Sequence, residues 1–319
     1  MKRTTMLLIW LTLLGLLTLP ACSSPVAMST QVPATDQPKT SEATQPPPSP
    51  TPTTEPFAAL VNGQPITLAE YERQVASYET SMTAAGQDPN TPEGQATLAQ
   101  NREWVLDQMI DQVLIVQAAG QAGVIISDAE LDATIRSLRD EIGEDAFQQW
   151  LQNEGMSLDE MRERLRSDMT AGQMANRIAD ERVPTRTEHV HARHILVSTE
   201  EEARQILAQL QAGADFVTLA QAYSQDISTR DTGGDLGFFP KGILTSPEVE
   251  AVAFSLQPGQ ISDVVPSALG FHIVQVVERV PDMEISADNL RLLRDKAVQE
   301  WVVSLRAAAQ IERFISTAP

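Results

Sequence analysis

Apolar positions between residues 57 and 183 recur mostly three and four apart, which is the spacing of one buried face on an α-helix. Three helix starts are marked by capping boxes, in which a hydroxyl and a Glu three residues later satisfy each other's backbone donors. These boxes are Thr67 to Glu70, Ser127 to Glu130 and Ser157 to Glu160. This part of the chain is therefore predicted to be mainly helical.

A fourth helix is predicted to begin at Thr91-Pro92, because proline suits the first helical position. Its expected buried stripe comprises Trp104, Val105, Met109, Val113, Leu114 and Val116. Ahead of all these helices, residues 58–67 predict a short strand, an Asn-Gly turn and the start of the first helix.

The pattern changes between residues 186 and 282, where short alternating segments and short helical segments follow each other. The expected elements are a strand at 189–197, helices at 199–211, 214–223 and 247–255, a glycine-rich loop at 233–239, a turn at 257–260 and a strand at 271–280. This order predicts a small α+β unit within an otherwise helical chain.

After this unit the helical spacing returns over residues 286–315. Its apolar stripe comprises Leu290, Leu293, Val298, Trp301, Leu305, Ile311 and Phe314. No neighbouring segment offers this stripe a partner, so the helix is expected to pack back on the N-terminal helices.

The first 21 residues resemble an export signal. Lys2 and Arg3 precede an apolar run that is too short to cross a bilayer but suits a signal peptide. The run ends at Cys22, the only cysteine, which follows a small residue as in a bacterial lipobox, although Pro20 is unusual there. A lipidated Cys22 is the favoured interpretation, and a plain secretory signal with an incidental cysteine is the alternative.

Residues 23–56 hold nine of the 20 prolines, among Thr, Ser and Gln, with very few apolar residues. Such a composition cannot form a core, so residues 22–56 are predicted to be a disordered tether.

The composition excludes several classes of function. The chain has 23 Lys and Arg against 43 Asp and Glu, a net charge of -20, and so would repel nucleic-acid phosphates. With one cysteine it can form neither an internal disulfide framework nor a cysteine-based zinc site. We therefore expect no nucleic-acid partner, no metal and no cofactor.

Five motifs follow one another within 186–282. They are ARHILV at 192–197, YSQD at 223–226, GGDLGFF at 233–239, AFSLQPGQIS at 253–262 and GFHIV at 270–274. These motifs resemble those of parvulin-type peptidyl-prolyl cis/trans isomerases, and the whole chain resembles bacterial extracytoplasmic foldases of the SurA and PrsA type. The resemblance implies a small antiparallel sheet surrounded by helices, inserted into a helical chaperone-like module.

The predicted domains are then a signal peptide at 1–21, the lipidated cysteine and tether at 22–56 and a helical chaperone-like domain at 57–185. The isomerase domain follows at 186–282, and a C-terminal helix at 283–319 packs on the helical domain.

The resemblance also implies the catalytic residues. His194 and His272, each in an alternating strand, would face one another at the floor of the site as neutral imidazoles, although two structural core histidines would show the same pattern. Asp226 would act electrostatically beside the amide, the alternative being an ordinary loop residue after a helix. Ser267 would supply a hydroxyl near the site.

The proline-binding slot departs from the family pattern. Many relatives place Met and Phe there, whereas this chain has Leu244 and Val249 at the nearest positions, with one residue inserted. Phe254 is a further candidate for substrate binding, although a core position is expected to suit it better. The smaller side chains put catalytic strength in question but not the fold.

Two other features favour ordinary structural roles. His189, His191 and His194 lie in one strand, where residues 191 and 194 face opposite sides, so a shared metal ion is not expected. The acidic run 200–202 suits the first turn of a helix and stands where phosphate-directed parvulins are basic, which argues against phosphopeptide specificity.

These observations predict a lipid-anchored, extracytoplasmic bacterial foldase, an enzyme of class EC 5.2.1.8, whose partners are unfolded or partly folded exported proteins with X-Pro bonds. One alternative is a holdase chaperone with a silent parvulin domain. Another is a surface-anchored structural lipoprotein.

Overall fold

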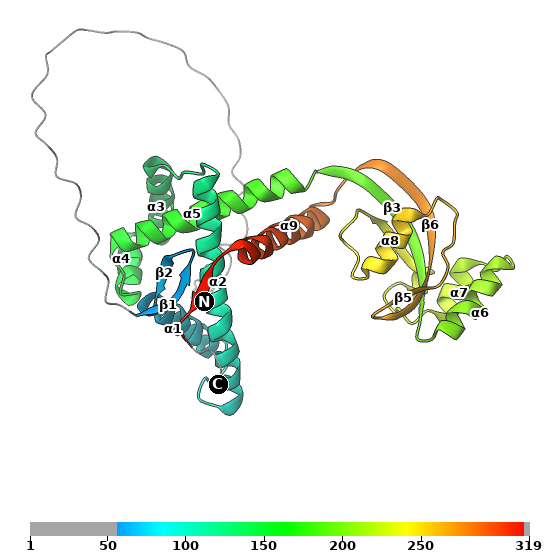
Figure 1. Ribbon diagram of the computed structural model, residues 1–319, viewed down its shortest axis with the longest axis horizontal. Coiled ribbons are helices and arrows are strands. Elements are labelled where there is room, and N and C mark those ends of the chain that lie inside the picture. The colour runs from blue at the N-terminus through cyan, green and yellow to red at the C-terminus, as the bar shows by residue number, and fades with distance from the viewer. Residues whose placement is uncertain (1–55, 316–319) are drawn as a thin grey trace, which may run out of the picture. The chain divides into compact units, whose positions relative to one another are not determined.

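The computed structural model describes residues 56–315, so the expected signal peptide, Cys22 and most of the tether lie outside the described residues (Figure 1). The helical elements are α1 (Leu68–Ala84), α2 (Pro92–Gln121), α3 (Asp128–Ile142), α4 (Glu144–Asn153), α5 (Leu158–Arg182), α6 (Glu200–Gln211), α7 (Phe216–Tyr223), α8 (Pro247–Ser255), α9 (Ala287–Ala308) and a 3-10 turn (Arg230–Thr232). The strands are β1 (Phe57–Val61), β2 (Gln64–Thr67), β3 (Arg186–Val197), β4 (Asp235–Phe239), β5 (Val265–Ser267), β6 (Gly270–Glu284) and β7 (Ile311–Arg313).

The described chain divides into two compact units. The first comprises residues 56–60, 65–106 and 313–315, and the second comprises residues 61–64 and 107–312. In the first unit, the Tyr71 hydroxyl donates to the Arg102 carbonyl at 3.2 Å, which joins the two helices. Trp104 is 52% exposed, against expectation, and its ring lies 6.2 Å from that of Tyr78. The buried stripe of α2 contains Val105, Leu106, Ile110 and Leu114. The buried face of the helix therefore includes Val105 but not its neighbour Trp104.

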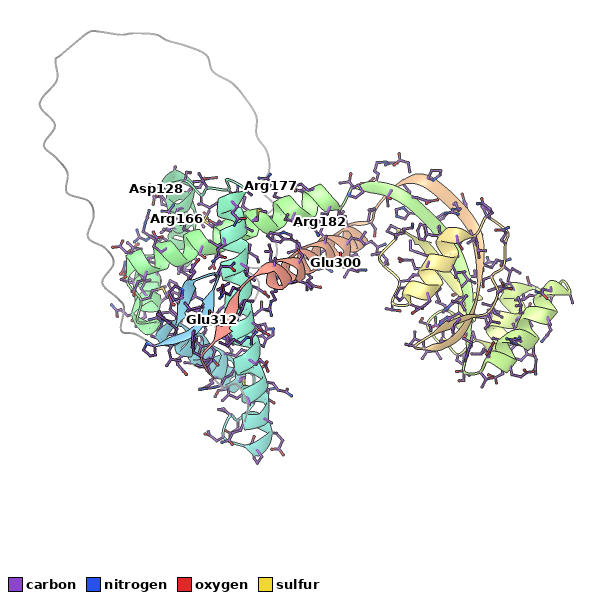
Figure 2. All side chains as sticks on the ribbon, viewed as in Figure 1. Asp128, Arg166, Arg177, Arg182, Glu300 and Glu312 are labelled. Carbon is purple, nitrogen blue, oxygen red and sulfur yellow. The ribbon has the colours of Figure 1, made fainter. Side chains whose placement is uncertain are left out.

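The predicted helix starts are confirmed. In each box the cap hydroxyl of Thr67, Ser127 or Ser157 accepts from the backbone N–H of the Glu three residues on. The carboxylate of that Glu accepts in turn from the backbone N–H of the cap residue. Asp128, next to the second cap, pairs with Arg166 of α5 at 2.8 Å. Both residues are labelled in Figure 2. These local bonds make the helix starts readable from sequence alone.

In the second unit, α9 lies along α5, as Figure 1 shows, and shares a buried cluster with α2 and α5. This cluster comprises Ala119, Met174, Ile178 and Trp301. At the far end of α9, Arg306 bonds to Asp107 at 3.3 Å and also to Asp111. The apolar stripe of α9 therefore has partners that are distant in sequence.

The predicted extent of this last helix is wrong. It ends at Ala308, and Ile311–Arg313 form a strand in a sheet of order β2-β1-β7. The Phe314 amide donates to the Ala58 carbonyl at 3.0 Å, and its side chain is 53% exposed. Strand pairing satisfies these backbone groups, so a tertiary contact overrides the helical spacing.

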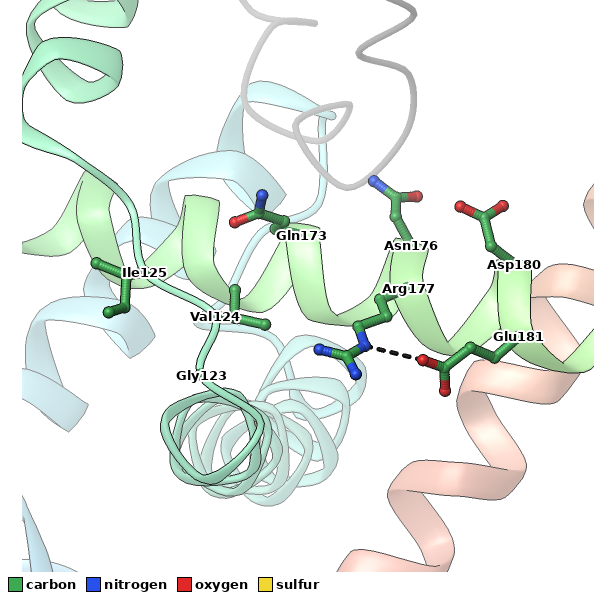
Figure 3. A pocket seen from close by; sticks show the side chains of 8 residues that line it. All are labelled: Gly123, Val124, Ile125, Gln173, Asn176, Arg177, Asp180 and Glu181. Atoms are coloured by element: carbon green, nitrogen blue, oxygen red, sulfur yellow. Dashed lines mark hydrogen bonds and ion pairs between the residues drawn. The ribbon is translucent and has the colours of Figure 1, made fainter.

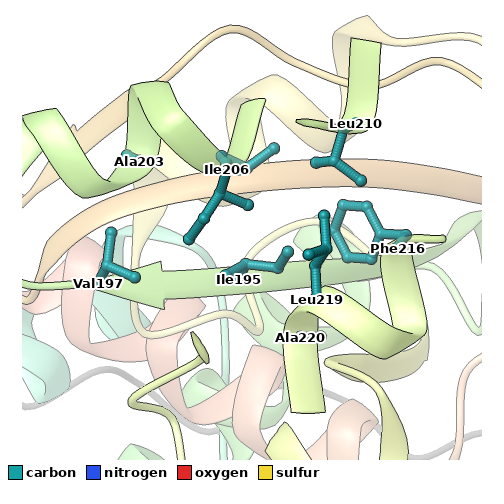
Figure 4. Close-up of a cluster of buried hydrophobic side chains, with 9 residues drawn as sticks. Ile195, Val197, Ala203, Ile206, Leu210, Phe216, Leu219 and Ala220 are labelled. Atoms are coloured by element: carbon teal, nitrogen blue, oxygen red, sulfur yellow. The ribbon is translucent and has the colours of Figure 1, made fainter. Parts of the chain in front are cut away.

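The α+β segment predicted at residues 186–282 is built on an antiparallel sheet of order β4-β3-β6-β5. One face packs on α6 and α7 through Ile195, Val197, Ile206, Phe216 and their neighbours (Figure 4). The other face carries Val190, Ala192, Val274 and Val276 and packs on α8. Because side chains alternate along a strand, both apolar faces come from the same two strands.

Residues 235–239, expected in a loop, form the edge strand β4, and β5 was not expected. Gly234 explains the first difference. Its φ is +79°, and a Cβ there would stand 2.0 Å from the His194 carbonyl oxygen. Only glycine allows the chain to approach β3 this closely before pairing with it.

Candidate active site

The two predicted histidines meet on the α8 face of the sheet. His194 of β3 and His272 of β6 continue the row of Ala192 and Val274, with 6% and 1% of their surface exposed. Their Nδ1 atoms are 3.2 Å apart, and the rings stack at a centroid distance of 5.4 Å. The expected contact between these histidines is thus present.

Asp226 reaches this pair from the segment that follows α7. The Gln225 amide donates to the Leu196 carbonyl at 2.7 Å, and the Ser224 hydroxyl accepts from the Leu196 amide, so the segment is tied to β3. Asp226 Oδ2 then lies 2.7 Å from His194 Nε2. The loop is therefore held where its carboxylate can orient the imidazole.

Two hydroxyls that the sequence analysis did not single out hold the Asp226 carboxylate. Ser228 donates to Oδ1 from its amide at 3.0 Å and from its hydroxyl at 2.5 Å, while Thr229 Oγ1 donates to Oδ2 at 2.7 Å. The bond from the Ser228 amide to Asp226 is an Asx turn, and hydroxyl residues two and three positions after Asp226 were the available sequence signal. Burial by itself would raise the pKa of Asp226, but these bonds and His194 outweigh it and hold the pKa well below its usual range.

Ser267, in β5, closes the other end of the array, with its Oγ 2.8 Å from His272 Nε2. The Leu269 amide donates to the same hydroxyl at 3.0 Å. Burial, and secondly the neighbouring His194, lower the pKa of His272 to about 4, so this ring is neutral at pH 7. Asp226, His194, His272 and Ser267 therefore form one continuous hydrogen-bonded chain.

The direction of these hydrogen bonds follows from the ionised carboxylate. Asp226 can only accept, so His194 Nε2 carries a proton and donates to it. His272 is neutral, so only one of its ring nitrogens carries a proton. The ring therefore donates to one of its two partners, His194 Nδ1 and Ser267 Oγ, and accepts from the other.

The three predicted slot residues lie on the same sheet face but differ in exposure. Val249 is 2% exposed and belongs to the buried cluster with Val190 and Phe239, whereas Leu244 and Phe254 are half-buried against it. The Phe254 ring meets Phe239 edge-on at 6.0 Å, and Lys241 Nζ lies 5.1 Å from its centre. Leu244 and Phe254 thus offer more apolar surface than Val249.

The other two histidines of β3 have separate partners. His189 Nδ1 lies 3.0 Å from the Thr187 carbonyl oxygen, and His191 Nε2 lies 2.6 Å from Asp235 Oδ1. Within residues 56–315 no group of three or more His, Cys, Asp or Glu side chains could hold a metal ion. Over the same range no helix combines the length and the apolar character needed to span a bilayer.

A shallow depression lies in the helical region, between the α2–α3 connection and α5 (Figure 3). Ile125 at its edge is 80% exposed, and Arg177 bonds to Glu181 at 2.8 Å and to the Ala122 carbonyl at 3.2 Å. Because Arg177 pairs with Glu181, the depression has no concentrated charge of either sign.

Comparison with known proteins identifies the family of the chain. Residues 184–278 match the PPIC-type PPIase domain, a rotamase, and residues 44–175 match the SurA-like N-terminal domain. The foldase protein PrsA of Caldanaerobacter subterraneus is 32% identical over 276 residues, which cover 80% of this chain and 86% of that protein. The chain belongs to the PrsA foldase family.

Two further relatives agree with this assignment. The PrsA foldase of Halalkalibacterium halodurans is 32% identical over 231 residues, covering 66% of this chain and 68% of that protein. The chaperone SurA of Hahella chejuensis is 31% identical over 208 residues, covering 56% of this chain and 48% of that protein. The foldase is therefore a parvulin-type peptidyl-prolyl isomerase and chaperone for exported proteins, and the predicted family, fold class and enzyme class are confirmed.

Proposed function

We propose that the hydrogen-bonded chain from Asp226 to Ser267 is the catalytic centre, acting on X-Pro bonds of unfolded or partly folded exported proteins. The observation that supports this most is the ionised Asp226 carboxylate, 2.7 Å from a histidine that contacts a second, neutral histidine. Such a fixed array can bind the X-Pro amide while no covalent bond is broken.

Rotation about a peptide bond crosses a barrier of about 18 to 20 kcal/mol, which arises from the double-bond character of the C–N bond. No nucleophile is required, because no bond is broken. A thousandfold acceleration needs only about 4 kcal/mol of preferential stabilisation of the twisted state. Exclusion of water from the planar amide and a few fixed polar groups can supply this amount.

The proline ring would occupy an apolar slot beside the array. Leu244 and Phe254 would contact the ring, and Val249 would support the slot from beneath, since its side chain is buried. The nearby Asp226 and Glu248 both act on His272 as negative charges, so an acidic residue next to the proline would be repelled.

The test is a protease-coupled isomerisation assay on tetrapeptides that differ in the residue before proline. Wild-type protein should accelerate isomerisation, and Glu-Pro peptides should react more slowly than Leu-Pro peptides because of the charge on Asp226 and Glu248. Suppression of aggregation of an unfolded client is measured alongside. Aggregation suppressed with no isomerisation above the uncatalysed rate would identify a holdase with a silent parvulin domain instead.

The domain limits proposed are 57–185 for the helical domain, 186–282 for the isomerase domain and 283–319 for the returning helix. The buried cluster shared by α2, α5 and α9 supports this arrangement. A protein spanning 57–185 should therefore unfold at a clearly lower temperature than the same segment carrying 283–319 joined by a flexible linker. Equal unfolding midpoints in circular dichroism would contradict the split domain.

We also propose that the protein is extracytoplasmic and is anchored to a bacterial membrane through a lipid on Cys22. The motif at the end of the apolar run and the proline-rich tether support this. Cys22→Ser should move the exported protein from the membrane to the soluble fraction, since an acyl anchor would be lost. Fractionation with blotting measures this, and Ser23→Ala is the control; equal membrane retention of both variants would refute the anchor.

A further inference from the structure

One carboxylate collects three consecutive backbone donors beside the proposed slot. The Gly242 amide lies 2.8 and 2.9 Å from the two Glu250 carboxylate oxygens. The Ile243 and Leu244 amides donate to Glu250 Oε2 at 3.0 and 3.2 Å. The loop before α8 is therefore wrapped around a side chain of α8 itself.

The sequence makes this arrangement possible at two points. Gly242 has a φ of +95°, a conformation that side chains with a Cβ rarely adopt, and this turn directs its amide toward the carboxylate. Bonds from N–H groups to an ionised carboxylate are stronger than those between neutral groups. Without Glu250, three adjacent donors would depend on water, and the loop would lose its fixed path.

The loop and the helix that Glu250 joins each carry a proposed slot residue. Leu244 is the last donor residue of the loop, and Val249 precedes Glu250 in α8. Fixing the loop to the helix therefore fixes the position of Leu244 relative to Val249, which supports the slot from beneath. The Glu250 carboxylate accepts from this loop. The residues Asp226, His194, His272 and Ser267 instead contact one another.

We propose that Glu250 is a positioning residue for substrate binding, which clamps the 242–244 loop so that Leu244 forms a wall of the proline slot. This inference rests on the proposed function, because it takes Leu244 and Val249 as slot residues. A clamp on the slot should act on peptide affinity and leave the turnover step alone. A purely structural carboxylate would instead change stability without changing KM.

The experiment measures kcat, KM and peptide affinity for full-length Glu250→Gln with one X-Pro tetrapeptide. Glutamine keeps the shape but loses the charge that gathers three donors. We expect KM and the peptide Kd to rise about tenfold, because loop ordering must then be supplied on binding. The value of kcat should stay within about twofold of wild type.

Two further variants make the result specific. Gly242→Ala disturbs the same clamp from the loop side through its positive φ, and should raise KM in the same way. Glu202→Gln is the matched control, because its carboxylate accepts from Thr199 at 3.0 Å at the start of α6, away from the slot, and should leave KM unchanged.

Folded Glu250→Gln and Gly242→Ala proteins with wild-type KM and Kd would overturn the role of Glu250. A wild-type protein that binds the peptide without isomerising it would refute the proposed function, while the Kd values would still decide on the clamp.

Discussion

Asp226→Ala is expected to lower kcat/KM for X-Pro tetrapeptides on the order of a hundredfold, the usual loss when one fixed polar group of a catalytic site is removed. The carboxylate is the acceptor at one end of the array, so its loss frees the His194 ring to rotate. His272 then loses a fixed hydrogen-bond partner. The protease-coupled assay at pH 7 measures this change.

Asp231→Asn is the matched control for this experiment. Asp231 lies in the same loop and pairs with its neighbour Arg230 at 3.0 Å, but its side chain is 80% exposed. It should therefore keep wild-type turnover. If Asp226→Ala keeps its fold and turns over within about twofold of wild type, the carboxylate has no part in catalysis.

The isomerase unit is expected to lose about 3 kcal/mol of unfolding free energy between pH 6.5 and pH 4 because of His272. Its pKa is lowered to about 4 in the folded protein, against about 6.5 in an unfolded chain. Between these values the unfolded state binds the proton and the folded state does not, so stability falls as pH falls. Above pH 6.5 neither state binds it, and the stability is at its full value.

Urea unfolding of wild type and His272→Gln at pH 7 and pH 4.5 tests this. The variant should be less stable at pH 7, because a buried ring with two hydrogen bonds is replaced. It should also lose less free energy on acidification, since the titrating ring is gone. Asp226 does not account for the difference, because its lowered pKa costs stability only below its ordinary value of about 4. Equal pH slopes for the two proteins would contradict the prediction.

Much of the local structure could be predicted because its causes are local. The capping boxes at Thr67, Ser127 and Ser157 each close within one helical turn, so no distant residue is needed to form them. The meeting of His194 and His272 followed from strand alternation together with the resemblance, which supplied the pairing of the two strands.

Other features could not be read from spacing, because distant residues decide them. Trp104 and Val105 fit the same periodic stripe, and only the packing of α2 determines that Val105 is buried while Trp104 is exposed. Residues 311–313 fit a helical stripe as well, yet backbone pairing with β1 makes them a strand. In both places the local preference is weaker than the tertiary contact.

Sequence alone was enough to predict the helix starts at Thr67, Ser127 and Ser157, the family, and the candidates His194, Asp226, His272 and Ser267. Each of these depends on residue type and order along the chain. The tertiary structure alone decided that Ser228 and Thr229 hold the Asp226 carboxylate, that Val249 is buried, and that Glu250 binds three loop amides. Hydrogen bonds and burial depend on distances between folded segments, and these distances exist only once the backbone has taken its path.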